Sequence, residues 1–380
     1  MASPIKHILK LLVIFTALTA NSFAQPQKYI RVAVMEDASS LSLKAPGHYE
    51  IRDSRTQKVL SRGRNLKTTV TTYKNGILLG KVTSNTPKLF IKTDESGIIV
   101  INGRRLRGNI ELIKKDNGKI VAVNHIDLED YVKGISVREI SHYWPPEALK
   151  AEVIVFRTFA IYKMGESAGK DYDLTSDIYS QVYSGTAAER YRINKAVDET
   201  RGLVLTYKGR ILPAFYHATC AGHTEDASML WNINLAPLKG IACGFCRESP
   251  HFSWHYVGSP DEIKEKLSKA GYKTEDIKDI IILGKDNSGR ITDLKIVSGK
   301  KDLKISAKDF RDIMGPNIIK STNFSVNVIK DDVVFEGFGW GHGVGLCQWG
   351  AYFMAKQGYT ADEILKYYYP GTEISPDTSI

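Results

Sequence analysis

The sequence predicts an α+β protein in which a β-rich amino-terminal part is followed by a mixed domain built around a buried helix. Up to about residue 125, short segments rich in β-branched residues alternate with turn residues at hairpin-like intervals. The segments are residues 29–35, 76–82, 88–92 and 97–101, and the turns are Asn75-Gly76, Asn102-Gly103 and Asn117-Gly118. A longer apolar run downstream indicates that helical structure follows.

That helix is expected over residues 147–164, after a shorter one over residues 128–135. Pro145 and Pro146 stand at its start, where proline is tolerated because the first helical N–H groups have no partner inside the helix. Apolar residues surround nearly its whole circumference, which predicts that it is buried. Arg157, in its second half, must extend to solvent or pair with an anion, because burying an unpaired guanidinium group is costly.

The first 24 residues have the pattern of a secretory signal. Lys6, His7 and Lys10 precede an apolar run at residues 11–18. Small residues, Ser22 and Ala24, then stand before the expected cleavage point. The mature chain is then expected to begin at Gln25. No later stretch has the roughly 18 consecutive apolar residues of a membrane span. We therefore expect an exported protein of the periplasm, cell envelope or extracellular space, without a transmembrane segment.

The net charge is +10, and it falls to +8 without the signal segment, which contains two lysines and no acid. A basic surface can approach an acidic polymer, such as nucleic acid or an anionic envelope polymer. Export, and the lack of interleaved aromatic and basic residues, argue against nucleic acid. A solvated basic surface is the simpler interpretation.

Separate blocks of the chain, in order, have a distinctive composition. They are residues 128–134 (LEDYVKG), Glu139, residues 147–151 (EALKA), residues 157–160 (RTFA), residues 180–185 (SQVYSG), residues 216–225 (YHATCAGHTE), residues 321–324 (STNF), residues 339–351 (GWGHGVGLCQWGA) and residues 368–372 (YYPGT). Together they resemble the stage II sporulation protein D family, which also includes the amidase-enhancer proteins. The resemblance covers about residue 100 to the end. It implies a catalytic domain with a substrate cleft at 99–380, and the strand and turn pattern leaves a β-rich amino-terminal domain at 25–98 before it.

The resemblance also implies a lytic transglycosylase that acts on peptidoglycan glycan strands, including strands stripped of their stem peptides. Its catalytic glutamate falls on Glu139. One carboxyl group can protonate the glycosidic oxygen and then accept the proton of the sugar's 6-hydroxyl group, which gives a 1,6-anhydro end. Glycoside hydrolysis, in contrast, ordinarily uses two carboxyl groups. An acid at neutral pH needs a raised pKa, which apolar neighbours such as Ile140, Tyr143 and Trp144 can provide.

Several other residues are candidates for substrate binding. Arg157 either orients substrate or forms a structural ion pair with Glu129, Asp130 or Glu152. Polar and aromatic side chains suit a polysaccharide cleft, and the candidates are Gln181, Tyr183, His217, His342, Gln348 and Trp349. Tyr183 and Trp349 have an alternative interpretation as core aromatics.

His342 lies in a glycine-dense block. Glycine at this density weakens a helix or strand but lets backbone approach a ligand. We therefore expect this block to form one wall of the cleft, with His342 and Gln348 facing Glu139. The alternative is a tightly packed turn around Trp340 and Trp349.

The cysteines suggest a metal site. Cys220 and His223, followed by Cys243 and Cys246, form two short-spaced pairs of the kind seen in structural zinc sites. His217 is an alternative ligand to His223. A disulfide is the competing interpretation for an exported protein, but it would leave one of the three clustered cysteines unpaired. We favour structural zinc and expect no organic cofactor.

Two further classes of function stay open. The chain could be a binding module that stimulates a cell-wall amidase, or a zinc hydrolase that uses His217 or His342. Release of anhydro-sugars from purified glycan would separate the transglycosylase from both.

Overall fold

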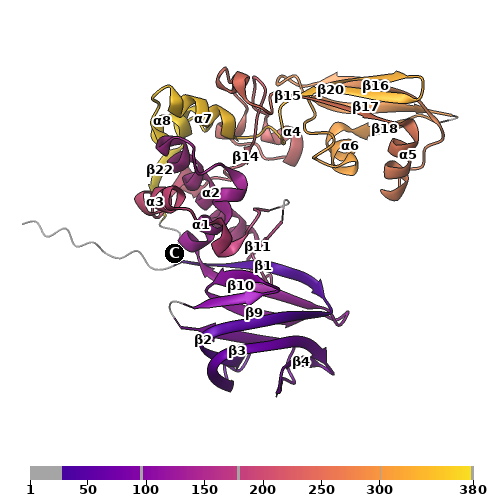
Figure 1. Ribbon diagram of the computed structural model, residues 1–380. Helices are drawn as coiled ribbons and strands as arrows, with labels where there is room; N and C mark the ends of the chain where they lie inside the picture. The colour runs from indigo at the N-terminus through magenta and orange to yellow at the C-terminus, as the bar shows by residue number, and fades with distance from the viewer. Residues whose placement is uncertain (1–27, 95–96, 178–179, 300, 378–380) are drawn as a thin grey trace, which may run out of the picture.

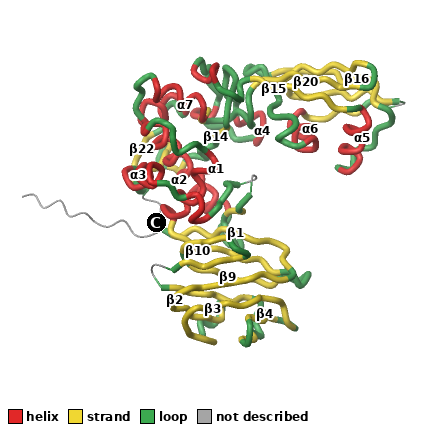
Figure 2. Tube along the Cα trace, in the orientation of Figure 1, coloured by secondary structure: helices red, strands yellow, loops and turns green. Residues whose placement is uncertain are grey.

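The computed structural model describes residues 28–94, 97–177, 180–299 and 301–377. The expected signal segment, residues 1–24, lies outside the described residues. The α+β prediction is confirmed, with a large strand-rich part at the amino end and a mixed part beyond it (Figure 1, Figure 2).

The amino-terminal part is an eleven-stranded sheet. Its strands are β1 (Tyr29–Ala38), β2 (Ser40–Asp53), β3 (Val59–Tyr73), β4 (Gly76–Leu79), β5 (Val82–Thr83), β6 (Lys88–Thr93), β7 (Ile98–Ile101), β8 (Arg104–Arg107), β9 (Asn109–Lys114), β10 (Ile120–Asp127) and β11 (Leu174–Thr175). Neighbouring strands pair antiparallel except β1 with β11, which pair in parallel. The sheet therefore continues past the boundary expected at residue 98, because β9 pairs with β6 and β10 pairs with β1.

The central part is helical. Its helices are α1 (Leu128–Glu139), α2 (Pro146–Glu166), α3 (Tyr191–Glu199), α7 (Gln348–Lys356) and α8 (Ala361–Tyr368). The side chain of Asp127 caps α1 by accepting hydrogen bonds from the backbone N–H groups of Glu129 and Asp130. Helix α2 begins with proline in its first turn and is buried along most of its length, as the sequence predicted.

Short elements complete this central part. They are η1 (Gly185–Ala188), β12 (Leu203–Tyr207), β13 (Arg210–Ile211), β14 (Tyr216–His217), α4 (Ala227–Trp231), η2 (Ala236–Leu238), η3 (Phe245–Glu248), β21 (Leu346–Cys347) and β22 (Glu373–Pro376). Strands β14 and β21 pair in parallel, with Tyr216 opposite Leu346 and His217 opposite Cys347. This pairing joins two segments that are far apart in the sequence.

A third unit, residues 253–338, is inserted into the central part and extends away from it (Figure 1). It contains β15 (Ser253–Gly258), α5 (Pro260–Lys269), β16 (Ile277–Lys285), β17 (Ile291–Ser298), β18 (Leu303–Ser306), α6 (Ala307–Met314), β19 (Phe324–Ile329) and β20 (Asp332–Phe338). Phe310, Phe324 and Phe335 belong to its own hydrophobic core. Beyond residue 98 the sequence had suggested one catalytic domain, without this insertion.

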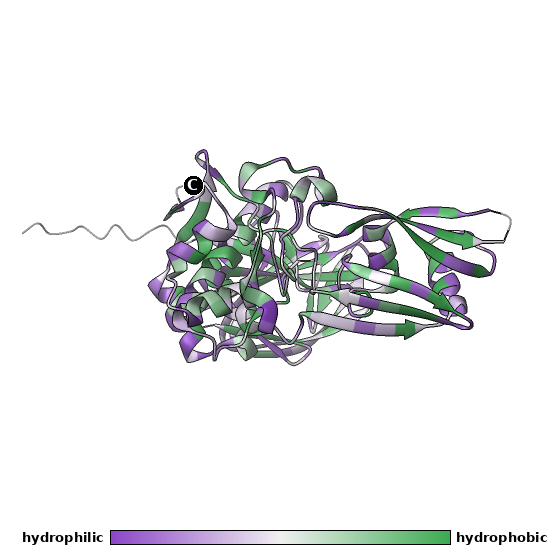
Figure 3. Ribbon diagram, turned by 90° about the horizontal axis from the view of Figure 1, so that it is seen from above, coloured by the Kyte–Doolittle hydropathy of each residue, from purple (hydrophilic) through white to green (hydrophobic). Residues whose placement is uncertain are grey.

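Hydrophobic residues gather among the helices of the central part (Figure 3). The largest core cluster joins the sheet to α1 and α2, through residues such as Ile126, Tyr131 and Phe156. Among the described residues, no helix is long and apolar enough to cross a membrane.

Candidate functional site

Glu139 is the last residue of α1, and the next residue, Ile140, is already extended. The helix thus ends where the chain turns towards the proline pair before α2. The backbone N–H of Val182 donates a hydrogen bond to Oε1 of Glu139, with N and O 3.2 Å apart. The carboxyl group is therefore held by one backbone contact at a helix end, with no ion pair to any described residue.

Two cavities meet at Glu139. The helix-side cavity, of about 660 Å³, is lined by Glu139, aromatic residues and a few polar residues: Phe159, Tyr162, Phe215, Tyr216, Trp231, Lys163, Glu166, Ser180 and His342 are among them. The tryptophan-side cavity, of about 560 Å³, is lined by Glu139 together with Arg138, Ser141, His142, Trp144, His251, Trp340, Gln348 and Trp349, among others. Glu139 is thus a lining residue that the two cavities share.

Burial raises the pKa of Glu139 from its ordinary value of 4.5 to about 7. Hydrogen bonding from the Val182 N–H and from the Tyr216 hydroxyl group acts in the opposite direction, because both favour the ionised form. Burial is the larger effect. The carboxyl group can consequently carry a proton near neutral pH and also release it.

A chain of buried polar groups supports Tyr216. The hydroxyl group of Tyr131 donates to the side-chain oxygen of Gln181 at 3.0 Å, and the Gln181 amide group donates to the hydroxyl oxygen of Tyr216 at 3.2 Å. Gln181 is fully buried and does not line either cavity. Gln181 was predicted to bind substrate. In the structure it lies behind the cavity wall and is connected to the cavity through its hydrogen bond to Tyr216.

His342 and Gln348 come from the glycine-dense block and lie at Glu139 on different sides. His342 lines the helix-side cavity, and Gln348 lines the tryptophan-side cavity. The Gln348 amide group donates to the backbone carbonyl oxygen of Glu139 at 3.5 Å. Burial, together with the neighbouring His217, holds the pKa of His342 well below its ordinary value, so its ring is neutral.

The same block shows why its glycines are needed. Gly345 has a φ of 73°, and a Cβ atom there would lie 2.0 Å from the backbone oxygen of Phe215. The block therefore packs its backbone closely against the segment around β14, and this contact carries His342 into the cavity.

His217 is buried beneath the helix-side cavity. Its Nδ1 atom lies 3.1 Å from the carbonyl oxygen of Val344, which fixes the proton on that nitrogen. Burial lowers the pKa of His217 to about 3. It contacts the ring of His342, with 5.7 Å between ring centroids, and thus adjoins the cavity without lining it.

Arg157 and Tyr183 do not lie where substrate binding requires them. Arg157 is fully buried and donates to both carboxylate oxygens of Glu129, at 2.9 and 2.7 Å, and to the carbonyl oxygen of Leu203. Tyr183 is also buried, and its hydroxyl group donates to Asn124 at 2.9 Å. The substrate-binding predictions for both residues are corrected here: Arg157 forms a structural ion pair, and Tyr183 is a core aromatic.

Glu152 is a further residue near the site, which the sequence pattern suggested only as one of three possible partners of Arg157. It lies on α2, is fully buried and interacts electrostatically with Glu139. A carboxylate inside a strongly apolar helix was the available signal, because such a residue needs either a partner or a proton.

Four buried cysteines form one cluster. The Sγ atoms of Cys220, Cys243, Cys246 and Cys347 all lie within 4.8 Å of one another, and all four are free thiols. A tetrahedral zinc ion with Zn–S bonds of about 2.3 Å needs sulfur atoms about 3.8 Å apart, which fits this arrangement. The donor set is thus suited to a four-thiolate metal site.

His223 was predicted as the fourth ligand, but Cys347 takes that place. The backbone of His223 forms a β-bridge with Ala242, and its Nδ1 atom lies 2.6 Å from the carbonyl oxygen of Thr224. Cys347 arrives instead through the pairing of β14 with β21, and its sulfur accepts a hydrogen bond from the Cys220 N–H at 3.3 Å. His217, the alternative ligand, is outside the cluster as well.

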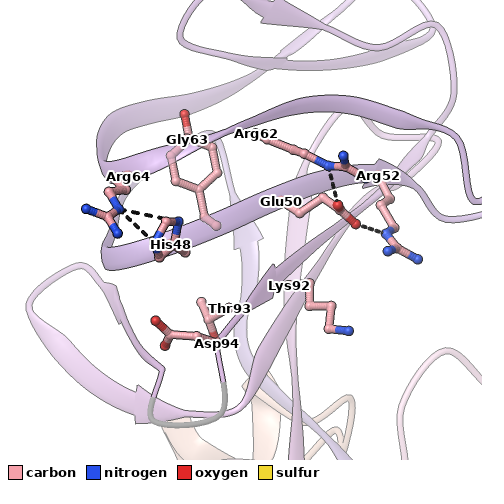
Figure 4. Close-up of a pocket in the computed structure, with 10 residues that line it drawn as sticks. His48, Glu50, Arg52, Arg62, Gly63, Arg64, Lys92, Thr93 and Asp94 are labelled. Carbon is pink, nitrogen blue, oxygen red and sulfur yellow. Dashed lines mark hydrogen bonds and ion pairs between the residues drawn. The ribbon is translucent and has the colours of Figure 1, made fainter.

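A separate hollow of about 520 Å³ lies on the amino-terminal sheet, over β2, β3 and β6 (Figure 4). Glu50 stands between Arg52 and Arg62 and forms an ion pair with each of them. Arg64 donates to the ring of His48 at 2.7 Å. Most of these charges are already matched within the sheet, so the cavities at Glu139 remain the better candidate for chemistry.

Comparisons with known proteins show what this chain is similar to. A family model described as stage II sporulation protein matches residues 116–207, which include Glu139, and a domain of unknown function matches residues 238–345. An uncharacterized protein of Brachyspira hyodysenteriae is 30% identical over 350 residues, covering 92% of this chain and 93% of that protein. Stage II sporulation protein D of Bacillus subtilis is 32% identical over 269 residues, covering 67% and 76% respectively. A protein named amidase enhancer, also of Bacillus subtilis, is 27% identical over 292 residues, covering 64% and 40%.

Proposed function

Because the chain belongs to the stage II sporulation protein D family, we propose that it is an exported lytic transglycosylase that cuts the glycan strands of peptidoglycan. A cell-wall-related role follows from the family itself. The specific reaction is the proposal, and Glu139 is its catalytic residue.

One observation carries the proposal: Glu139 presents a carboxyl group with a pKa of about 7 where two cavities meet. A general acid works best when its pKa is near the working pH, because it is then both protonated and able to give up the proton. A polymer that is cut internally must extend on both sides of the acid. The helix-side and tryptophan-side cavities supply those two sides.

The reaction needs only this carboxyl group. Protonated Glu139 gives its proton to the oxygen that links two sugars, and that bond breaks as positive charge develops on the sugar ring. The ionised carboxylate then takes the proton of the same sugar's 6-hydroxyl group, whose oxygen bonds to the anomeric carbon. Water is not consumed, and Glu139 ends protonated as it began. The product is a 1,6-anhydro sugar.

The cavity walls suit a sugar chain. Aromatic rings can stack on the apolar faces of sugars, and Tyr162, Phe215 and Trp231 line one side while Trp340 and Trp349 line the other. His342 and Gln348 offer uncharged hydrogen-bonding groups for hydroxyl and acetamido groups. We propose these two residues as substrate-binding residues.

The cysteine cluster is proposed to hold one zinc ion in a structural role. Four thiolates close the coordination sphere, so no position remains for a reacting water. Cys220, Cys243, Cys246 and Cys347 would hold the ion, which would tie the loop after β14 to the start of α7. The zinc hydrolase alternative loses support, because His217 and His342 are not part of the cluster.

A second candidate function is enhancement of a separate cell-wall amidase. The similarity to a protein named amidase enhancer favours it, and binding to peptidoglycan would be common to both functions. The two proposals differ in the products that the purified protein releases by itself.

The test is digestion of purified peptidoglycan glycan, with and without stem peptides, followed by mass spectrometry. The transglycosylase proposal expects anhydro ends, each lighter by one water than the corresponding hydrolysed end. The same experiment shows whether stem peptides must be removed first. Binding without any new ends, together with a faster reaction of an added amidase, would favour the enhancer instead.

A further inference from the structure

Glu152 is a carboxyl group buried inside the protein on α2. The residue is 0% exposed, and neither carboxyl oxygen has a hydrogen-bond partner among the described residues. Isolated carboxylates are costly to bury, so such a group needs a cation, a set of donors or a proton. No described lysine, arginine or histidine forms an ion pair with it. Arg157, five positions along the helix, is already paired with Glu129.

The groups around Glu152 favour the protonated form. Burial raises its pKa well above the ordinary value of 4.5, and the negative charge of Glu139 raises it further. The titratable groups that interact with it from other elements are Glu139 at the end of α1, Tyr216 on β14 and Tyr369 after α8. The Gln348 side chain on α7 is the one group that acts in the opposite direction. Complete burial without a paired cation, together with these neighbours, favours the uncharged carboxylic acid, which has one hydrogen to donate.

Gln348 connects this acid to the catalytic residue. Its side chain lies beside Glu152, and its amide nitrogen donates to the backbone carbonyl oxygen of Glu139 at 3.5 Å. An amide side chain has one accepting oxygen and one nitrogen with two N–H groups to donate. If the nitrogen serves Glu139, the oxygen is free to accept a hydrogen bond from a protonated carboxyl group. An ionised Glu152 could not donate to that oxygen and would instead compete with the Glu139 carbonyl oxygen for the amide N–H groups.

We propose that Glu152 is a positioning residue for Glu139: as an uncharged acid it orients the Gln348 amide group, which in turn holds the backbone of Glu139 at the end of α1. The inference rests on the proposed role of Glu139 and adds to that role the residue that keeps Glu139 in place at the two cavities. Glu152 touches no substrate and takes no part in the proton transfer.

Three single variants and one double variant separate the uncharged donor from simple packing. Glu152→Gln keeps the size, and its amide group can still donate to the oxygen of Gln348, so kcat should stay within about twofold of wild type. Glu152→Leu fills the space but cannot donate, so kcat should fall by about tenfold, the effect of losing one ordinary hydrogen bond, with little change in KM. Gln348→Leu should lower kcat by at least as much and also raise KM, because Gln348 is proposed to bind substrate as well. The double variant Glu152→Leu/Gln348→Leu should have little lower kcat than Gln348→Leu, since Glu152 acts through Gln348.

Thermal unfolding gives a readout that does not depend on activity. A carboxyl group with a raised pKa in the folded protein stabilises the fold at low pH and loses that contribution as pH rises from 4.5 towards its folded pKa. The Tm of Glu152→Gln minus that of wild type should therefore increase as the pH rises above 4.5. A Tm difference that does not change with pH would overturn the proposal, because Glu152 would then be ionised in the fold.

Titration of Glu139 by carbon NMR supplies the second such readout. Glu152→Gln should leave the pKa of Glu139 near its wild-type value, whereas Glu152→Leu should lower it, because a displaced carboxyl group is better hydrated. If wild type cleaves glycan and Glu152→Leu has an unchanged kcat and Glu139 pKa, the positioning role is wrong while the proposed function stands. If wild type forms no anhydro ends, the proposed function fails and this inference fails with it.

Discussion

The side-chain amide of Gln348 donates a hydrogen bond to the backbone oxygen of Glu139 at 3.5 Å, across 209 positions of the sequence. It connects the first residue of α7 to the last residue of α1, so two helix ends meet at the candidate site. The two cavities share Glu139 at this junction. Removing or displacing that carboxyl group should therefore affect cleavage before it affects the fold.

Glu139→Gln should abolish cleavage and keep glycan binding. The amide group preserves the shape of the carboxyl group but cannot transfer a proton, and general acid catalysis contributes roughly 10²–10⁴-fold to a rate. Initial rates of anhydro-end formation and binding to insoluble glycan would be measured side by side. Glu199→Gln, an exposed carboxyl group on α3, serves as the control and should cleave at the wild-type rate. Anhydro ends formed at wild-type rate by Glu139→Gln would remove the assignment.

Cleavage should slow as the pH rises through about 7. Glu139 must be protonated to act as an acid, and burial raises its pKa to about 7, so the active form disappears above that pH. Stability should follow the same group: the fold binds this proton more tightly than the unfolded chain, so wild type loses stability relative to Glu139→Gln between pH 4.5 and about 7. Rate profiles and melting curves over this range check both statements. A rate that stays constant well above pH 7 would contradict the first.

Tyr216→Phe should move the alkaline limb of the rate profile to higher pH. The Tyr216 hydroxyl group favours the ionised form of Glu139, and its removal raises the pKa of that carboxyl group further. The pH at half-maximal rate is the quantity to compare. Tyr256→Phe, which removes a hydroxyl group bonded to Glu262 in the insertion, is a matched control and should leave the profile in place. A shift to lower pH in Tyr216→Phe would contradict the role of the hydroxyl group in favouring the ionised form of Glu139.

The purified chain should contain one zinc ion held by four cysteines. Elemental analysis gives the metal content, and Cys347→Ser should lower both that content and the Tm, because thiolate ligation stabilises the fold directly. His223→Ala is the informative control: it should retain zinc, since His223 lies outside the cluster. A metal-free protein with a mass lower by two hydrogens would indicate a disulfide instead.

Arg157→Met should destabilise the fold by about 3–5 kcal/mol, the usual cost of leaving one member of a buried ion pair without its partner. The ion pair with Glu129 is buried on both sides. Adding Glu129→Gln should recover part of the loss, because the remaining charge is then removed. Denaturant unfolding measures both effects, and Lys308→Met, from an exposed pair with Asp312, should change stability by less than about 1 kcal/mol. A stable Arg157→Met protein with weakened glycan binding would restore the substrate-binding interpretation.

The position of the candidate acid could be predicted from local sequence. The blocks around Glu139, and the glycine-dense run, are each continuous stretches of sequence. The proline pair and the apolar run also predict α2 correctly. The cysteine spacing indicated a metal site for the same reason, since three of its four members lie in one loop region. The helix, the glycine-dense block and the cysteine pairs each depend on residues that are close together in the chain, so they can be predicted from the sequence.

Long-range partners could not be predicted in this way. The cysteine cluster contains Cys347 and not His223 because β14 and β21 pair in parallel and bring Cys347 to the other three cysteines, which no spacing within the loop reveals. Residues 253–338 form a separate unit because their core closes on itself, and the sheet continues past residue 98 because β10 returns to β1.

By itself, the sequence determined the fold class, the buried helix, the family and the glutamate that carries the proposed chemistry, because each depends on residue identity and local periodicity. Only the tertiary structure decided that Arg157 pairs with Glu129, that Tyr183 lies in the core, and that Glu152 is buried without a partner. It also decided the raised pKa of Glu139. Desolvation and ion pairing depend on which distant segments exclude water from a side chain, and that is fixed only when the sheet, the helices and the glycine-dense block pack together.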